Sequence, residues 1–168
     1  SEGERLAIKK IADSGFKAEI CSYVRALTAD IDTALACDVD SVHLVVPVSD
    51  LHIQIKLKAD RESVVRMAVD VTEYAKDHGL IVELSGEDAS RADQDFLAGL
   101  YTAGIEAGAD RLAFCDTVGV LVPEVAADIF SRLSRLEAPI SIDCQKKIGM
   151  ATANTVAALR AGASQAHV

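Results

Sequence analysis

The chain has 168 residues, of which half are hydrophobic, 26% are charged and three are proline. This composition excludes a disordered tail or a collagen-like chain, and the length fits one domain or part of a larger one. A net charge of −9 and the absence of tryptophan argue against a nucleic-acid partner. There is no membrane-length apolar run, no signal peptide and no CxxC pair, so we expect a cytoplasmic protein without a membrane partner.

Two periods of apolar residues alternate along the chain. Apolar positions three and four apart predict helices at 5–13, 28–37, 61–78, 91–107, 123–136 and 150–161. Short apolar runs predict strands at 17–24, 41–47, 80–85, 111–116, 139–144 and 165–168. Strict alternation of this kind predicts a parallel sheet with crossover helices.

A short repeat marks three of the expected helix ends. Three segments have the same order: small residues that end a helix, then Asp38, Gly108 or Gly162, and then a strand. Gly at such a position predicts a left-handed helix cap, and Asp is a tolerable substitute. Repeated helix–cap–strand units fit either a (β/α)8 barrel or an open doubly wound sheet.

Polar residues at the carboxyl ends of the strands favour the barrel. They are Arg25, Ser49, Asp50, Ser85, Glu87, Asp88, Asp116, Thr117, Asp143 and Gln145. An open sheet binds its ligand at one switch point, whereas here five successive strands end in reactive groups. We expect Asp30, Asp60 and Ser90 to be ordinary helix N-caps.

An eight-stranded barrel usually needs about 200–250 residues. The chain offers six strands, begins with a helix and stops inside a strand. We therefore expect an α/β fold, an incomplete TIM-type (β/α) barrel of about six parallel strands, with residues 1–168 as a single partial barrel domain.

Several segments together carry a resemblance to a known family. They are Ile20–Arg25, His43–Ile53, Tyr74–Gly79, Glu83–Arg91, Cys115–Val120 and Gly149–Thr155. The chain resembles the 2-isopropylmalate, citramalate and homocitrate synthases, which are metal-dependent TIM-barrel enzymes. The resemblance covers nearly the whole chain and corresponds to the middle and later part of the family's catalytic barrel.

The resemblance implies a chemistry and a set of site residues. Family members condense acetyl-CoA with a 2-oxo acid bound to a divalent metal (Mg, Mn or Zn), as in leucine biosynthesis. Arg25 and Thr117 match contacts to the substrate carboxylate, and Ser85 and Glu87 match polar contacts to the oxo acid. From the residues alone, Arg25 could instead form a surface salt bridge, Glu87 a helix cap and Thr117 a turn hydrogen bond.

The sequence departs from the family at its metal motif. The family has His-x-His followed by Asn-Asp, where this chain has Asp143, Cys144, Gln145, Lys146 and Lys147. Two imidazole ligands are therefore replaced by one carboxylate and one amide, and two positive charges follow them. We expect metal binding at Asp143 and Gln145 to be weak or absent.

The function is therefore left open between three hypotheses. The first is a 2-isopropylmalate synthase-like acyltransferase with little or no activity, because the family's Arg-Asp-Gly first strand is also missing. The second is a non-catalytic αβ scaffold, natural or engineered, that pairs its open edges in a homo-oligomer or domain-swapped dimer. The third is a lyase of the same superfamily. We assign no catalytic residue, and we expect His43 to be a packed core histidine and His52 and Lys56 to face solvent.

Overall fold

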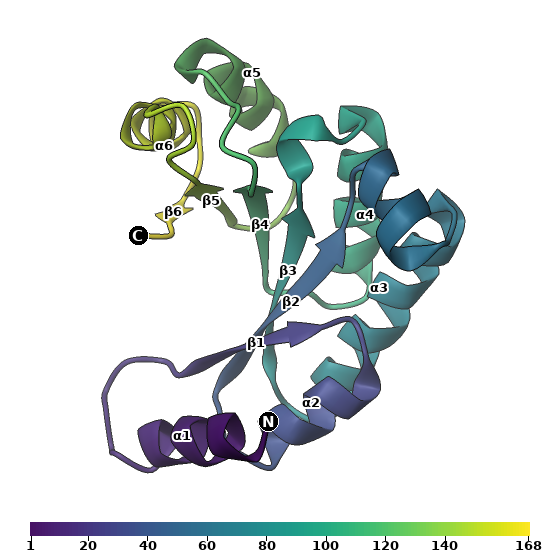
Figure 1. Cartoon of the computed structure of the whole chain (residues 1–168), viewed down its shortest axis with the longest axis vertical. Coiled ribbons are helices and arrows are strands. Elements are labelled where there is room, and N and C mark those ends of the chain that lie inside the picture. Colours follow the sequence, from purple (N-terminus) through teal and green to yellow (C-terminus); the bar gives the residue numbers. More distant parts are fainter.

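The computed structural model describes all 168 residues (Figure 1). The α-helices are α1 (Glu2–Ala12), α2 (Thr28–Leu35), α3 (Arg61–Asp77), α4 (Gln94–Glu106), α5 (Pro123–Leu133) and α6 (Ala151–Arg160). The strands are β1 (Cys21–Arg25), β2 (Ser41–Pro47), β3 (Ile81–Glu87), β4 (Arg111–Asp116), β5 (Ile140–Cys144) and β6 (Gln165–Ala166). Two short turns, the π-helical η1 (His52–Leu57) and the 3-10 η2 (Ala89–Arg91), follow β2 and β3 and were not predicted.

The strands form one parallel sheet in the order β1-β2-β3-β4-β5-β6. Each strand pairs with the next one in the sequence, and the order never reverses, as it would at the switch point of a doubly wound sheet. This order is that of a barrel wall, so the expected α/β architecture with six parallel strands is confirmed. β1 and β6 are the open edges.

The two faces of the sheet have opposite chemistry, because side chains alternate along a strand and paired residues share a face. One face carries the strand part of the hydrophobic core: Val24, Val42, Leu44, Val46, Val82, Leu84, Leu112, Phe114, Ile140 and Ile142. The other face, called the inner face below, is mostly polar, although Val45, Pro47 and Ala113 also lie on it. Its polar residues include Tyr23, Arg25, His43, Glu83, Ser85, Glu87, Cys115, Ser141 and Asp143. A polar inner face is suited to binding ligands.

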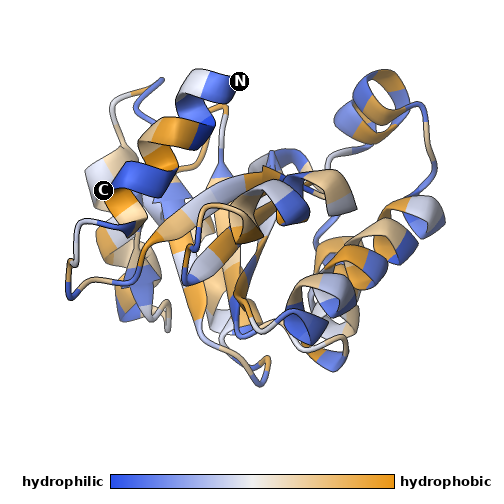
Figure 2. Cartoon of the chain, turned by 90° about the horizontal axis from the view of Figure 1, so that it is seen from below, coloured by the Kyte–Doolittle hydropathy of each residue, from blue (hydrophilic) through white to orange (hydrophobic).

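The helices α2 to α6 all contribute to the same hydrophobic core. In Figure 2 the strands are largely orange, whereas orange and blue alternate along the helices, as expected for helices with one apolar face. The helix α1 is different, because none of its residues is buried. Its Leu6 and Ile11 side chains are about half exposed. None of the helices combines the length and the apolar character that a membrane crossing requires.

The expected left-handed caps are confirmed, with φ of 55° at Asp38, 99° at Gly108 and 118° at Gly162. The N-cap at Asp60 is also confirmed, since its side chain accepts a hydrogen bond from the Ser63 backbone N–H.

Two N-cap predictions are wrong. Asp30 lies inside α2, where its carboxylate bonds to the backbone N–H and the guanidinium of Arg25. Ser90 lies inside η2, and its hydroxyl donates to Asp116. In both cases the side chain hydrogen-bonds to a residue at the end of a strand instead of to the backbone N–H groups at the start of its own helix.

Candidate functional site

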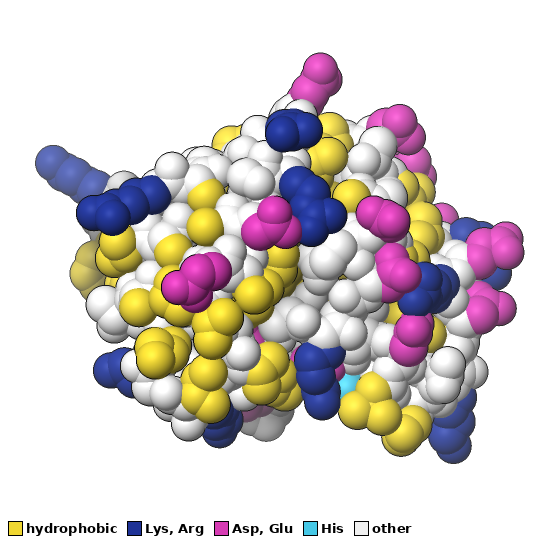
Figure 3. Space-filling model, turned by 90° about the horizontal axis from the view of Figure 1, so that it is seen from above, with side chains coloured by type: hydrophobic (Ala, Val, Ile, Leu, Met, Phe, Trp, Pro, Cys, Tyr) yellow, Lys and Arg dark blue, Asp and Glu magenta, His cyan; other side chains and the backbone are white.

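A small pocket of about 140 Å³ lies on the inner face, toward the carboxyl ends of the strands. Nine residues line it: Tyr23, His43, Val45, Ser85, Glu87, Cys115, Thr117, Asp143 and Gln145. The sheet register explains the arrangement, because Glu87 pairs with Cys115, which pairs with Asp143. Seen from the end toward which the strands point, acidic and basic side chains are interspersed, so no large surface of one sign surrounds this end (Figure 3).

The pocket brings together five of the six residues that the sequence singled out. Ser85, Glu87, Thr117, Asp143 and Gln145 all line it. Arg25 does not, although it ends the neighbouring strand. Its guanidinium makes two 2.8 Å hydrogen bonds to Asp30 and is largely exposed. In this structure Arg25 forms a surface ion pair, so a contact with substrate would require that side chain to move.

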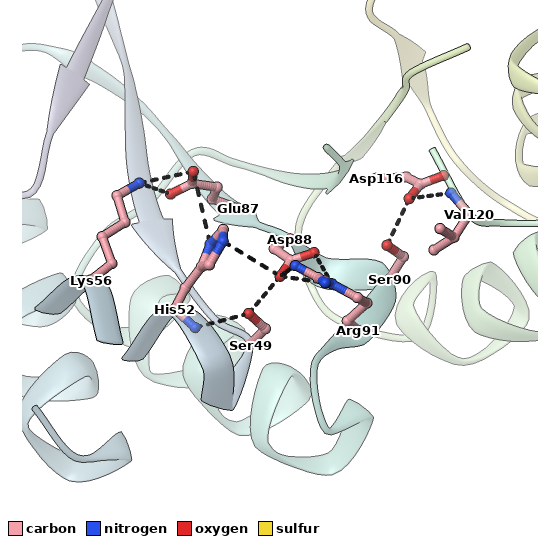
Figure 4. Close-up of polar contacts among 9 residues, drawn as sticks. All are labelled: Ser49, His52, Lys56, Glu87, Asp88, Ser90, Arg91, Asp116 and Val120. Atoms are coloured by element: carbon pink, nitrogen blue, oxygen red, sulfur yellow. Dashed lines mark hydrogen bonds and ion pairs between the residues drawn. The ribbon is translucent and has the colours of Figure 1, made fainter. Parts of the chain in front are cut away.

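Glu87 is held in place from η1 (Figure 4). Lys56 Nζ lies 2.6 Å and 2.9 Å from the two carboxylate oxygens of Glu87. His52 Nδ1 lies 3.9 Å from Glu87, and His52 Nε2 lies 3.9 Å from Asp88. The prediction that His52 faces solvent is therefore wrong, whereas Lys56 is exposed as predicted and also pairs with Glu87. Because η1 follows β2 after a short loop and β2 pairs with β3, side chains of η1 reach the end of β3.

Asp88 is fully buried and organises the turn that follows β3. Its carboxylate accepts hydrogen bonds from Ser49 Oγ (2.6 Å) and from the guanidinium of Arg91 (2.6–3.1 Å) (Figure 4). Burial raises the pKa of the Asp88 carboxyl, but the hydrogen bonds from Arg91 and Ser49 outweigh burial and hold that pKa below its usual range. Asp88 also has a φ of 64°, a conformation that Asp tolerates better than most residues.

Asp116 shapes the loop that carries Thr117. Its carboxylate accepts hydrogen bonds from Ser90 Oγ at 2.6 Å and from the backbone N–H groups of Val120 and Leu121, both at 3.1 Å. Asp116 is buried and does not line the pocket. Its role is therefore to fold the Asp-Thr-Val-Gly turn and to fix the position of Thr117.

Thr117 Oγ1 is buried and has no hydrogen-bond partner in the protein. A buried hydroxyl without a partner is unfavourable, so such an atom in a pocket points to a ligand that completes it. Ser85 Oγ lies 3.1 Å from Cys115 Sγ, and burial raises the pKa of the Cys115 thiol to about 12. Cys115 is therefore a neutral thiol rather than a nucleophilic thiolate.

The donors near Asp143 do not by themselves make the family's metal site. Asp143 offers a carboxylate and Gln145 an amide oxygen, without an imidazole between them. No group of three His, Cys, Asp or Glu ligand atoms that lie within 4.8 Å of one another includes Asp143. Thus this chain's own residues at Asp143 and Gln145 do not fit a divalent metal.

The one such group in the chain is His43, Glu83 and His167. His43 Nδ1 lies 2.9 Å from Glu83 Oε2, and His167 Nε2 lies 3.4 Å from Glu83 Oε1. The prediction that His43 packs in the core is wrong, since its side chain lies on the inner face and lines the pocket. The alternation of side chains along a strand could have predicted this position, because His43 and Glu83 lie two residues before Val45 and Ser85 and therefore on the same face of the sheet.

Comparisons with known proteins agree with this architecture. The (R)-citramalate synthase of Methanocaldococcus jannaschii is 53% identical over 169 residues, and a Methanosarcina acetivorans protein assigned as an (R)-citramalate synthase is 66% identical over 169 residues. These alignments cover 100% of this chain but 34% and 35% of the relatives, so the chain spans about a third of their length.

The hydroxymethylglutaryl-CoA lyase of Pseudomonas aeruginosa has a similar fold, with a TM-score of 0.80 at 16% identity over 94% of this chain and 56% of that one. The HMGL-like family model matches residues 1–168. The chain belongs to the HMGL-like family.

Proposed function

We propose that this chain forms the 2-oxo acid-binding part of an acyltransferase barrel that condenses acetyl-CoA with a short 2-oxo acid, in the manner of a citramalate synthase. The named relatives that cover the whole chain at 53–66% identity favour pyruvate, the acid from which citramalate is formed. The pocket of about 140 Å³ is well below the 300–1,000 Å³ typical of sites for drug-sized ligands, which suits a small acid.

The observation that carries this proposal is the buried, unpartnered Thr117 hydroxyl in the pocket. Ser85 and Gln145 add a hydroxyl and an amide to the same lining. Donors of this kind orient a carboxylate and a carbonyl without supplying charge. Glu87, tied to Lys56, presents a fixed carboxylate to the bound acid.

The charge of the pocket supports a site that other parts of the barrel complete. Glu87 and Asp143 both line it, and Lys56 neutralises only Glu87. An anionic substrate next to the second carboxylate needs a further cation. Enzymes of this family use a divalent metal, and when bound it supplies that charge and polarises the substrate carbonyl. We infer that the metal ligands of this pocket and the family's Arg-Asp-Gly first strand come from other parts of the barrel.

We place the lyase hypothesis second. The lyase structures match this chain at 13–20% identity, which shows the fold alone. The condensing activity is favoured because one relative named above is a citramalate synthase and the other is assigned as one. For residues 1–168 alone we expect no turnover, because the family's Arg-Asp-Gly segment does not occur in them.

The test measures the binding of pyruvate and of 2-oxoisovalerate to the 168-residue chain and to Thr117→Val, each in the presence of Mg²⁺, and follows binding by NMR chemical shifts. Thr117→Val keeps the side-chain shape and removes the hydroxyl, so pyruvate affinity should fall roughly tenfold or more, as expected for a lost hydrogen bond to a charged group. Thr102→Val is the matched control, because Thr102 is exposed on α4 and bonds to Ala98.

Equal pyruvate affinity for the chain and for Thr117→Val would contradict the proposal. A coupled assay for free CoA from acetyl-CoA and pyruvate, with Mg²⁺ or Mn²⁺, tests the second expectation. Turnover at ordinary enzyme rates by residues 1–168 would show that the chain already holds the whole catalytic centre.

A further inference from the structure

Three side chains, two from strands and one from the residue that follows β6, converge on the inner face, one layer below the pocket residues Ser85 and Glu87. His43 comes from β2, Glu83 from β3 and His167 from the end of the chain after β6. Their ligand atoms lie within 4.8 Å of one another. The Glu83 side chain is 5% exposed, and those of His43 and His167 are 14% and 26% exposed.

We propose that His43, Glu83 and His167 bind one divalent transition-metal ion of the zinc type, at a site distinct from Asp143 and Gln145. This inference does not depend on the proposed function. It assigns a metal to three residues of the barrel interior, of which only His43 also lines the pocket.

The donor set favours zinc over magnesium. Two imidazoles and one carboxylate are a known three-ligand set for Zn²⁺, whereas Mg²⁺ prefers oxygen ligands and bound water. Bonds of about 2.0–2.1 Å in tetrahedral geometry place neighbouring ligand atoms about 3.3 Å apart. His43 Nδ1 lies 2.9 Å from Glu83 Oε2 and His167 Nε2 lies 3.4 Å from Glu83 Oε1, so the two imidazoles approach different oxygens of the carboxylate, and one ligand atom from each residue lies within 4.8 Å of the others. Closing of the two rings around one Glu83 oxygen would bring the three ligands to that spacing and leave the fourth position of the ion open.

The surroundings hold the ligands in place. Ser141 Oγ donates a 2.6 Å hydrogen bond to Glu83 Oε1 and so orients the carboxylate. Tyr23 stacks on His43 with ring centroids 5.5 Å apart. Outer contacts of this kind fix the orientation of metal ligands.

The local charge also permits a cation. Arg111 is the nearest positive residue along the sheet, since it pairs with Glu83 in the register. Its guanidinium is engaged by two hydrogen bonds to Glu19, at 2.6 Å and 3.1 Å. The Glu83 carboxylate therefore has no guanidinium or ammonium partner, and the alternative to a metal is a proton on one of the two histidines that contact it.

The experiment titrates the metal-free 168-residue chain with Zn²⁺ by calorimetry and with Co²⁺ by visible absorption. We expect one site per chain and the intense Co²⁺ spectrum of a four-coordinate ion. His43→Gln and His167→Gln should each weaken Zn²⁺ binding at least tenfold. Ser141→Ala, which removes only the outer contact, should weaken it about tenfold.

His78→Gln is the matched control, because His78 lies at the end of α3 and bonds to the Tyr74 carbonyl. Circular dichroism of each variant shows that a loss of binding is not a loss of folding. The proposal is overturned by absence of Zn²⁺ binding to the folded chain, by equal binding in His43→Gln and His167→Gln, or by binding that Asp143→Asn abolishes and His167→Gln leaves intact.

Discussion

Lys56 and Glu87 form an ion pair that joins η1 to the end of β3, with Nζ 2.6 Å from Oε2 and 2.9 Å from Oε1. The residues are 31 positions apart, and the π-helical turn brings them together. The pair neutralises one of the two carboxylates that line the pocket. It connects a turn outside the sheet to the charge of the candidate substrate site.

Replacing Lys56 with methionine should affect the binding of pyruvate more than the stability of the fold. The Lys56 side chain is 53% exposed, so its loss should change the free energy of unfolding by less than about 1 kcal/mol. Pyruvate affinity should fall several-fold, because Glu87 would then present an unpaired negative charge to an anion. Urea unfolding and NMR titration measure the two effects. Lys58→Met is the control, since Lys58 makes no ion pair, and an equal loss of affinity in both variants would refute the local explanation.

Asp88→Asn should reveal a pH-dependent contribution to stability. The pKa of Asp88 is lowered in the folded protein, so its contribution is full above the unfolded value of about 3.9 and is lost as the pH falls through the folded-state pKa. At pH 7 the variant should lose about 1–2 kcal/mol, a value reduced because Arg91 is 40% exposed.

Urea titrations at pH 7 and near pH 3 measure this difference, which should be smaller in acid. Asn also tolerates the positive φ of this position, so backbone strain does not confuse the comparison. Asp70→Asn on the exposed side of α3 is the control. A difference between Asp88→Asn and the original chain that grows in acid would contradict the assigned sign.

The fold could be predicted because two periods of apolar residues repeat through the chain. The β2 and β4 bounds agree with the prediction, and the capping glycines at 108 and 162 have the expected positive φ. η1 and η2 could not be predicted, because each is too short to show a helical period. β3 extends to Glu87, beyond its predicted end at Ser85, because Glu87 still pairs with Pro47 and Cys115.

The site was predictable only where chemistry follows a strand end directly. Ser85, Glu87 and Thr117 meet in one pocket because adjacent parallel strands end together. The ion pair from Lys56 required knowledge of η1, and the cluster of His43 with His167 required the register of five strands. Arg25 is a residue whose place at a strand end gave the wrong expectation, because the sequence did not show that Asp30 holds its guanidinium away from the pocket.

Self-association remains a prediction, now with a defined surface. β1 and β6 are open edges, and Leu6, Ile11 and Phe16 are between 49% and 64% exposed on or just after α1. Exposed apolar groups beside an unpaired strand favour pairing with another chain. Sedimentation at micromolar concentration should show a dimer or larger species, and Leu6→Glu with Ile11→Glu should shift it toward monomer. A monomeric original chain would contradict this prediction.

Gly119 and Gly99 should respond to alanine in opposite directions. Gly119 has a φ of 61°, and a Cβ there would lie 2.6 Å from the Gln145 carbonyl oxygen and 2.8 Å from the Lys147 backbone nitrogen. Gly119→Ala should therefore cost more than about 2 kcal/mol through backbone strain and overlap. Because this contact joins the Thr117 loop to the Gln145 loop, pyruvate affinity should fall as well.

Gly99 lies exposed inside α4, with no atom within 4 Å of an added Cβ. Gly99→Ala should stabilise the chain by about 0.5–1 kcal/mol, because alanine loses less backbone entropy than glycine in a helix. Urea unfolding of both variants measures the two changes in the free energy of unfolding. If Gly119→Ala were as stable as Gly99→Ala, the two loops could not be in the close contact that positions Thr117 over the pocket.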